Sequence, residues 1–183
     1  MDAKTLCLGA LVRGPATGYE IRKMFEEGAY AALHPIGFGS IYPALTALLA
    51  DGLVACQEEA SPGRPGKKVY SLTPEGHAVL ASSFANTQPA EDKYKSDTLF
   101  MLSLADVMEP ERVRQLLSDY RAVNMAGLQE MEACDARNMP AGERFVFGLG
   151  LTVYSTIVDY LENNTDGLID ALKAETPFRK AGE

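Results

Sequence analysis

The chain has 183 residues, of which 46% are hydrophobic, 23% charged and 8% aromatic, and it contains no tryptophan. These proportions fit one or two small globular domains, and they exclude a disordered chain, a collagen-like repeat and a disulfide scaffold. Three well separated cysteines without a CxxC pair, Cys7, Cys56 and Cys134, favour a reducing compartment.

The amino terminus carries an acidic residue, Asp2, where a signal peptide carries positive charge. The apolar run from Leu6 to Val12 is too short to span a bilayer. The sequence therefore predicts a soluble cytoplasmic protein without membrane contact.

The net charge of −8 is unevenly divided along the chain. Residues 1–87 hold seven basic and eight acidic residues, a net charge of −1, whereas residues 88–183 hold ten and seventeen, a net charge of −7. Acidic surfaces repel phosphate, so any contact with nucleic acid is expected in residues 1–87. The segment 86–91, with its proline, is typical of a joint, and we predict two domains, 1–87 and 88–183.

Three helices are predicted in the first 52 residues. The first, residues 4–12, is mostly apolar and stops at Gly14-Pro15. The second begins at Thr17, which forms a capping box with Glu20. The third covers residues 38–52 and contains Pro43; it begins with Ser40 as its N-cap, or earlier with a kinked or tightened first turn, and the pattern leaves both open.

A hairpin and a fourth helix follow. Residues 53–56 and 69–72 are predicted strands, and residues 61–68 between them are typical of an exposed basic tip. Thr73-Pro74-Glu75 then supplies an N-cap, a proline for the first helical position and an early acidic residue, which predicts a helix towards Phe84.

The second half is predicted to be entirely helical, with helices at 98–104, from 110 towards 138, and from 142 to 161 or beyond. The last helix has two apolar flanks. One is spaced as a seam and is our predicted dimer interface: Phe147, Leu151, Tyr154, Val158 and Leu161. The other consists of Phe145, Leu149, Val153 and Tyr160. Either a second copy covers the helix, or the helix is central in its own bundle; periodicity favours neither.

The order helix, helix, helix, hairpin, helix is that of a winged helix-turn-helix. We therefore predict a mainly α fold, with an N-terminal winged helix-turn-helix bearing a small two-stranded wing and a C-terminal all-α dimerisation domain. Such a module places the third helix in the major groove and wing cations beside the backbone. The expected exposed positions of the third helix are Ser40, Tyr42, Pro43, Ala44, Thr46 and Ala47, and the wing charges are Arg64, Lys67 and Lys68.

Three segments in this order resemble the PadR family of transcriptional regulators. They are Thr17–Ile21; Gly39–Leu45 with Leu48 and Gly52-Leu53-Val54; and Gly63–Lys68 with Tyr70, Leu72, Thr73, Glu75 and Gly76. The long second half, with its Glu109-Pro110-Glu111 helix start, is similar to the subgroup with an extended carboxy-terminal domain.

This resemblance implies a homodimeric DNA-binding regulator, usually a repressor, that binds a palindromic operator. It also implies that the C-terminal helices exchange with the partner and that an aromatic small molecule releases some members from DNA. The positions that match the family near DNA are Tyr19, Ser40, Tyr42 and Thr46, with Arg64, Lys67 and Lys68 in the wing.

The chain departs from the family at the third helix. Thr46 and Ala47 stand where the family often has polar or basic residues, and Gly37 stands where it often has a capping Ser or Thr. A Thr-Ala pair suits contact with thymine methyl groups but not bidentate recognition of guanine. We therefore expect weak direct readout, with affinity resting on the wing and on the avidity of a dimer.

No catalytic set or metal site is predicted, since the two histidines, His34 and His77, lie in different elements without ligand companions. We expect no enzyme activity and no cofactor. Eight aromatic residues in the second half are enough to line an aromatic-effector cleft, although ordinary packing explains most of them. Alternative functions are a protein-interaction adaptor or a small-molecule sensor without strong DNA binding.

Overall fold

The structure is a computed structural model that describes residues 1–28, 30–31, 33–34, 36–61, 64–89, 91 and 95–175, apart from the side chains of residues 38, 59–61, 64 and 65. Its contacts divide the chain into two compact units, Met1–Glu91 and Asp92–Glu183. The predicted boundary lies after residue 87, and the observed division lies after Glu91. Each unit is described by itself.

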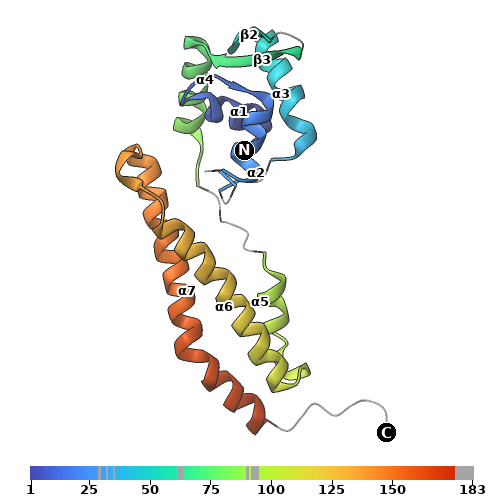
Figure 1. The fold of residues 1–183 in the computed structure, drawn as a ribbon, viewed down its shortest axis with the longest axis vertical. Helices are drawn as coiled ribbons and strands as arrows, with labels where there is room; N and C mark the ends of the chain where they lie inside the picture. Colours follow the sequence, from blue (N-terminus) through green and yellow to red (C-terminus); the bar gives the residue numbers. More distant parts are fainter. Residues whose placement is uncertain are drawn as a thin grey trace. The chain divides into compact units, whose positions relative to one another are not determined.

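Unit 1 contains the predicted helices and a small sheet (Figure 1). In chain order its elements are α1 (Ala3–Leu11), β1 (Ala16–Thr17), α2 (Gly18–Glu26), α3 (Phe38–Ala50), β2 (Val54–Ser61), β3 (Arg64–Leu72) and α4 (Pro74–Asn86). The predicted caps are confirmed. Thr17 and Glu20 form the capping box of α2, and Thr73 accepts a hydrogen bond from the Gly76 amide at the start of α4.

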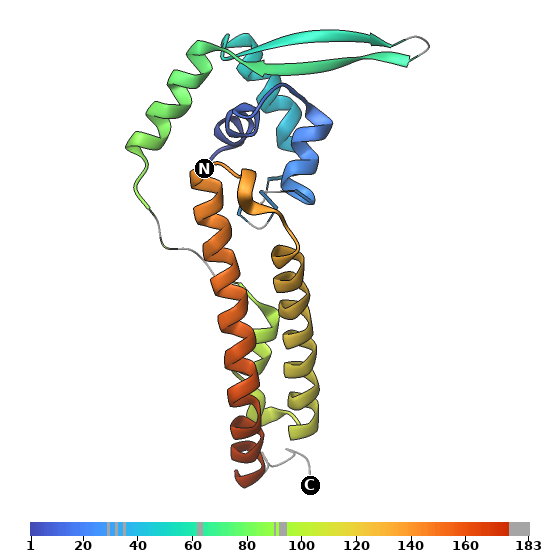
Figure 2. The ribbon, with the colours of Figure 1, turned by 60° about the vertical axis from the view of Figure 1, so that its left-hand side comes forward.

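The sheet is antiparallel, with strand order β1-β3-β2, and it differs from the predicted short hairpin. A third strand, β1, pairs Thr17 with Val69. The predicted loop at 61–68 is wrong for most of its length, because β3 begins at Arg64 and Lys67 and Lys68 lie within the strand. The tip residues 62 and 63 lie outside the described residues. Strands β2 and β3 extend outward from the helices as a long ribbon (Figure 2).

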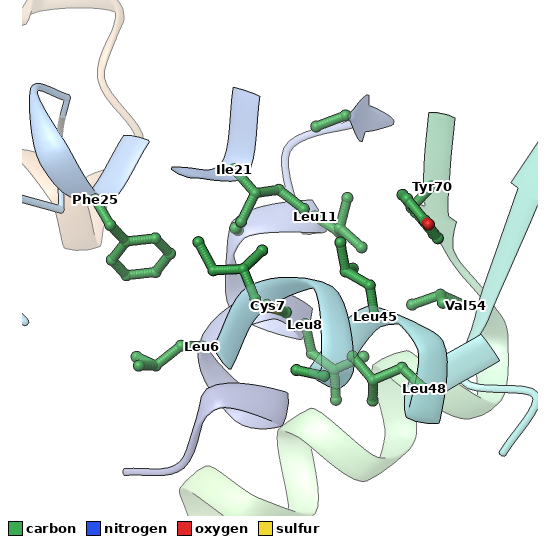
Figure 3. Close-up of a cluster of buried hydrophobic side chains, with 14 of the residues drawn as sticks. Leu6, Cys7, Leu8, Leu11, Ile21, Phe25, Leu45, Leu48, Val54 and Tyr70 are labelled. Carbon is green, nitrogen blue, oxygen red and sulfur yellow. The ribbon is translucent and has the colours of Figure 1, made fainter. Parts of the chain in front are cut away.

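The core of unit 1 is built from all of its layers (Figure 3). Leu8 and Leu11 of α1 meet Leu45 and Leu48 of α3, and the sheet adds Val54. Leu45 and Leu48 are fully buried. Burial of leucine-sized side chains stabilises a fold by about 1.5–3 kcal/mol each, so this cluster fixes the position of α3.

The described residues of unit 2 form helices joined by turns, without a strand. Its elements are α5 (Asp97–Leu102), the 3-10 turn η1 (Ala105–Val107), α6 (Pro110–Glu132), the 3-10 turn η2 (Ala136–Asn138) and α7 (Ala141–Ala174). The prediction that α6 continues towards residue 138 is wrong, because it ends at Glu132 and η2 follows. None of the described helices combines the length and hydrophobicity that a membrane crossing requires.

The long helices α6 and α7 lie side by side (Figures 1 and 2). Their core contains Val113 and Leu117 of α6 and Leu161 and Ile169 of α7. Gly127 allows close approach, since a Cβ atom there would lie 2.8 Å from the Tyr154 ring. Arg114 pairs with Asp166 at 2.7 Å, which links the two helices at their surface.

Candidate nucleic-acid interface

The outward face of α3 carries small and neutral side chains. Tyr42 and Thr46 are exposed, with Tyr42 at 49%, while Ser40 and Ala47 are half-buried. The prediction that Ala44 is exposed is wrong: it is buried with Ile41, three residues earlier on the same stripe. The exposed residues therefore form a narrower face than expected, without an ammonium, guanidinium or amide group.

The start of α3 settles the alternative left open by Pro43. The helix begins at Phe38 with Gly37 as its N-cap, and Pro43 lies inside it. Ser40 is not the N-cap; its hydroxyl donates to the Gly37 carbonyl oxygen at 2.5 Å and so closes the first turn. An interior proline lacks the amide hydrogen and so removes one hydrogen bond from the first two turns of the helix.

Tyr42 is held against the start of α2. A Cβ atom at Gly18 would lie 2.7 Å from the Tyr42 ring, so the absence of a side chain at Gly18 creates the seat for the ring. Tyr19, the next residue, is 62% exposed. The structure thus brings Tyr42 against the residue that precedes Tyr19, another of the predicted DNA-contacting residues.

The Thr46 hydroxyl is committed to its own helix. It donates to the Tyr42 carbonyl oxygen at 2.9 Å. A hydroxyl that bonds the carbonyl four residues earlier has used its only proton. What Thr46 offers to a ligand is therefore a methyl group and the remaining lone pairs of its oxygen.

The wing lysines lie on β3 and are exposed. The strand register places Lys68 opposite Glu58 and Lys67 opposite Glu59. The side chain of Arg64, the third predicted wing cation, lies outside the described residues. Glu58 lies beyond the predicted strand 53–56 and is absent from the predicted site. The signal for it is the acidic pair Glu58-Glu59 before the turn, matched by the basic pair Lys67-Lys68 after it.

Glu20 brings a further carboxylate to the base of the wing. Its carboxylate accepts from the Thr17 amide at 2.8 Å and from the Thr17 hydroxyl at 2.9 Å. These bonds hold the pKa of Glu20 below its usual value, and the charge of Lys67 lowers it further. Lys67 is thus close enough to act electrostatically on the start of α2.

Thr73 clamps the start of α4, which directly follows the wing, to the turn at the end of α3. The Thr73 hydroxyl donates to the Gly52 carbonyl oxygen at 2.9 Å, and the Thr73 amide donates to that of Leu53 at 3.2 Å. Gly52 has a φ of 70°, a left-handed conformation that favours glycine. The turn between α3 and β2 and the start of α4 are therefore locked together.

The predicted seam of α7 faces α6 of the same chain. Val158 and Leu161 are only 3% and 8% exposed, so their burial within the chain argues against them as the surface that a partner covers. Tyr154 is half-buried beside Gly127 of α6. Phe147 and Leu151 are half-buried as well. The exposed flank is the other one: Phe145, Leu149, Val153 and Tyr160.

Comparison with known proteins matches the first unit of the chain to a family model and most of the chain to one curated relative. Residues 7–82 match the family model for the transcriptional regulator PadR-like family. The negative transcriptional regulator PadR of Bacillus subtilis (strain 168) is 24% identical over 147 residues, 79% of either chain.

Two solved structures of Bacillus subtilis PadR share the fold. The complex with operator DNA aligns with a TM-score of 0.78 at 23% identity, covering 91% of this chain and 98% of that one. The complex with p-coumaric acid aligns with a TM-score of 0.69 at 23% identity and the same coverage. The family match is confined to residues 7–82, and at 23% identity the two structures show that this chain has the PadR fold.

Proposed function

We propose that the chain is a homodimeric repressor that binds a palindromic DNA operator through α3 and the wing. The observation that carries this is the placement of Tyr42, Thr46 and the exposed Lys67 and Lys68 on one folded unit. The clamp from Thr73 to Gly52 fixes the spacing between helix and wing. A helix in the major groove with cations beside the phosphates requires such a fixed spacing.

The dimer is supported by the apolar surface of unit 2. On α7, Phe145 is 76% and Tyr160 is 65% exposed, and Phe100 on α5 is 68% exposed. Water-exposed aromatic side chains in such number mark an interaction surface. A second copy is the occupant that a palindromic operator requires, because operator symmetry mirrors the twofold symmetry of the protein.

Repression and release by an aromatic effector rest on the relatives. The Bacillus subtilis relative is a negative regulator, and its structure has been solved with p-coumaric acid. For this chain we propose a planar aromatic ligand bound to unit 2 that favours a state with lower operator affinity. A ligand shifts such an equilibrium only as far as its affinities for the two states differ.

Selection of bound duplexes from a random pool, followed by mobility-shift titration at several salt concentrations, tests the proposal. Two equal half-sites and a salt-dependent shift are expected. Replacing Arg64, Lys67 and Lys68 with alanine should flatten the plot of log affinity against log salt by up to about three units. Failure to select any sequence at low salt, with or without aromatic acids, would reject operator binding.

A protein-interaction adaptor is the second candidate, and the neutral face of α3 is the observation that favours it. The exposed side chains of Tyr42 and Thr46 bring no cation to the groove-facing surface. Retention on a phosphate column separates the two functions, because an adaptor without DNA affinity elutes at the salt concentration expected from its net charge of −8.

A further inference from the structure

The wing is charge-balanced along its paired strands. Glu58 on β2 lies directly opposite Lys68 on β3, and both side chains are exposed. Directly opposed residues of an antiparallel pair lie on the same face, with Cβ atoms about 4.5–5.5 Å apart. The Lys68 ammonium group therefore has a carboxylate within reach before any phosphate arrives.

The pair occupies the inner face of the ribbon. Side chains two residues apart on a strand share a face, so Lys68 lies on the face of Tyr70 and Glu58 on that of Cys56. Tyr70 is 7% exposed and belongs to the core of unit 1, and Cys56 packs against the same core. Glu58 and Lys68 are thus the first opposed residues beyond the core on this face of the ribbon, which is the face that packs on the helices at Cys56 and Tyr70.

We propose that Glu58 limits phosphate binding by the wing, by holding Lys68 in a cross-strand ion pair. This inference rests on the DNA-binding function proposed above and names a residue that sets its strength. Duplex binding must then break or share the pair. In such a pair Lys68 would gain less from phosphate contact than an isolated lysine does, because the opposed carboxylate offsets part of its charge.

The proposed ion pair weakens contacts with phosphate and leaves contacts with bases unchanged. It therefore lowers affinity for every duplex by the same factor, whatever its sequence. Nonspecific binding is almost wholly electrostatic, so Glu58 lowers it while leaving the ratio of specific to nonspecific affinity unchanged.

The test compares the full-length wild type with Glu58→Gln by fluorescence anisotropy, using a mixed-sequence duplex and a selected duplex over a series of salt concentrations. The substitution should tighten binding to both duplexes by about two- to five-fold, the range expected from the energy of an exposed ion pair. It should also steepen the salt dependence by up to about one unit. Glu132→Gln, on α6 in unit 2, is the matched control for net charge and should change neither.

A double-mutant cycle with Lys68→Gln assigns the effect to the pair. Lys68→Gln alone should weaken binding, and Glu58→Gln added to it should produce little further gain. Equal gains in both backgrounds, or a Glu58→Gln protein that binds no more tightly than Glu132→Gln, would overturn the inference while leaving DNA binding intact. If the wild type binds neither duplex, the proposed function itself fails. Circular dichroism checks that all variants are folded.

Discussion

Gly76, in the first turn of α4, lies directly against the backbone carbonyl of Leu53, at the end of the turn that follows α3. A Cβ atom at Gly76 would overlap the Leu53 carbonyl oxygen, and it would also lie 3.2 Å from Leu72. The obstacle is mainly backbone, which cannot rotate away as a side chain can. This contact explains why a glycine stands three residues after the capping Thr73, in a segment that resembles the PadR family.

Gly76→Ala should therefore destabilise unit 1. Forced overpacking costs about 1–3 kcal/mol, and the backbone obstacle places this substitution at the upper end. Gly9→Ala is the matched control, because no atom lies within 4 Å of a Cβ at that position in α1; it should be neutral or stabilising by about 0.5–1 kcal/mol. Urea unfolding followed by circular dichroism measures both. Equal free energies of unfolding for the two variants would contradict the close contact between Gly76 and the Leu53 carbonyl.

Glu20 should make the stability of unit 1 depend on pH in the acid range. Its folded pKa is lowered by the hydrogen bonds to Thr17, from a usual value of 4.5. A lowered carboxyl pKa contributes stability that is complete above the unfolded value and is lost as the pH falls through the folded value.

Glu20→Gln should consequently have a lower melting temperature than the wild type at neutral pH, and the two should converge in acid. Thermal unfolding at a series of pH values checks this. Melting temperatures that stay parallel from neutral pH into acid would show that the capping carboxylate contributes nothing.

Thr46 should read a thymine methyl group, since its hydroxyl proton is already bonded to the Tyr42 carbonyl oxygen. Replacing thymine with deoxyuridine in a selected duplex removes the methyl group and should weaken wild-type binding about fourfold for each contact, the value of one buried methyl. Thr46→Ser lacks the protein methyl group and should respond less to the same replacement. A wild type indifferent to deoxyuridine at every position would exclude this contact.

Leu149→Glu, on the exposed flank of α7, should convert a dimer into monomers. Leu149 is 57% exposed, so its replacement leaves the α6 and α7 core in place, while a carboxylate in an apolar interface costs several kcal/mol. Sedimentation velocity should show one subunit, and operator affinity should fall with the loss of avidity. Val79→Glu on α4 introduces the same chemical change in unit 1 and should remain dimeric. If both variants sediment as the wild type does, the interface lies elsewhere.

Local signals predicted most of the fold. The capping box at Thr17 and the Thr73-Pro74 start of α4 are encoded within four residues, and the structure confirms both. Strand β1 was missed because two residues carry no periodicity and form a strand only by pairing with β3. The length of the ribbon was missed for a related reason: proline, glycine and lysine are typical of turns, and backbone pairing overrides that preference.

The candidate site was harder to predict than the fold. Periodicity places Tyr42 and Thr46 outward on α3, but it does not reveal that Gly18 seats the Tyr42 ring, because the two residues are brought together only by packing. Ala44 was misjudged because alanine is common on both faces of a helix. The heptad spacing marks the apolar stripe of α7, but a seven-residue pattern does not say whether the covering helix belongs to the same chain.

The two apolar flanks of α7 have different consequences for the evolution of the protein. Substitutions at Val158 or Leu161 alter the hairpin of α6 and α7 itself, since both side chains are buried within it. Substitutions at Leu149 or Tyr160 alter only an outer surface. Descendants of this chain can therefore acquire new binding preferences along one edge of a single helix while inheriting an unchanged scaffold from the other.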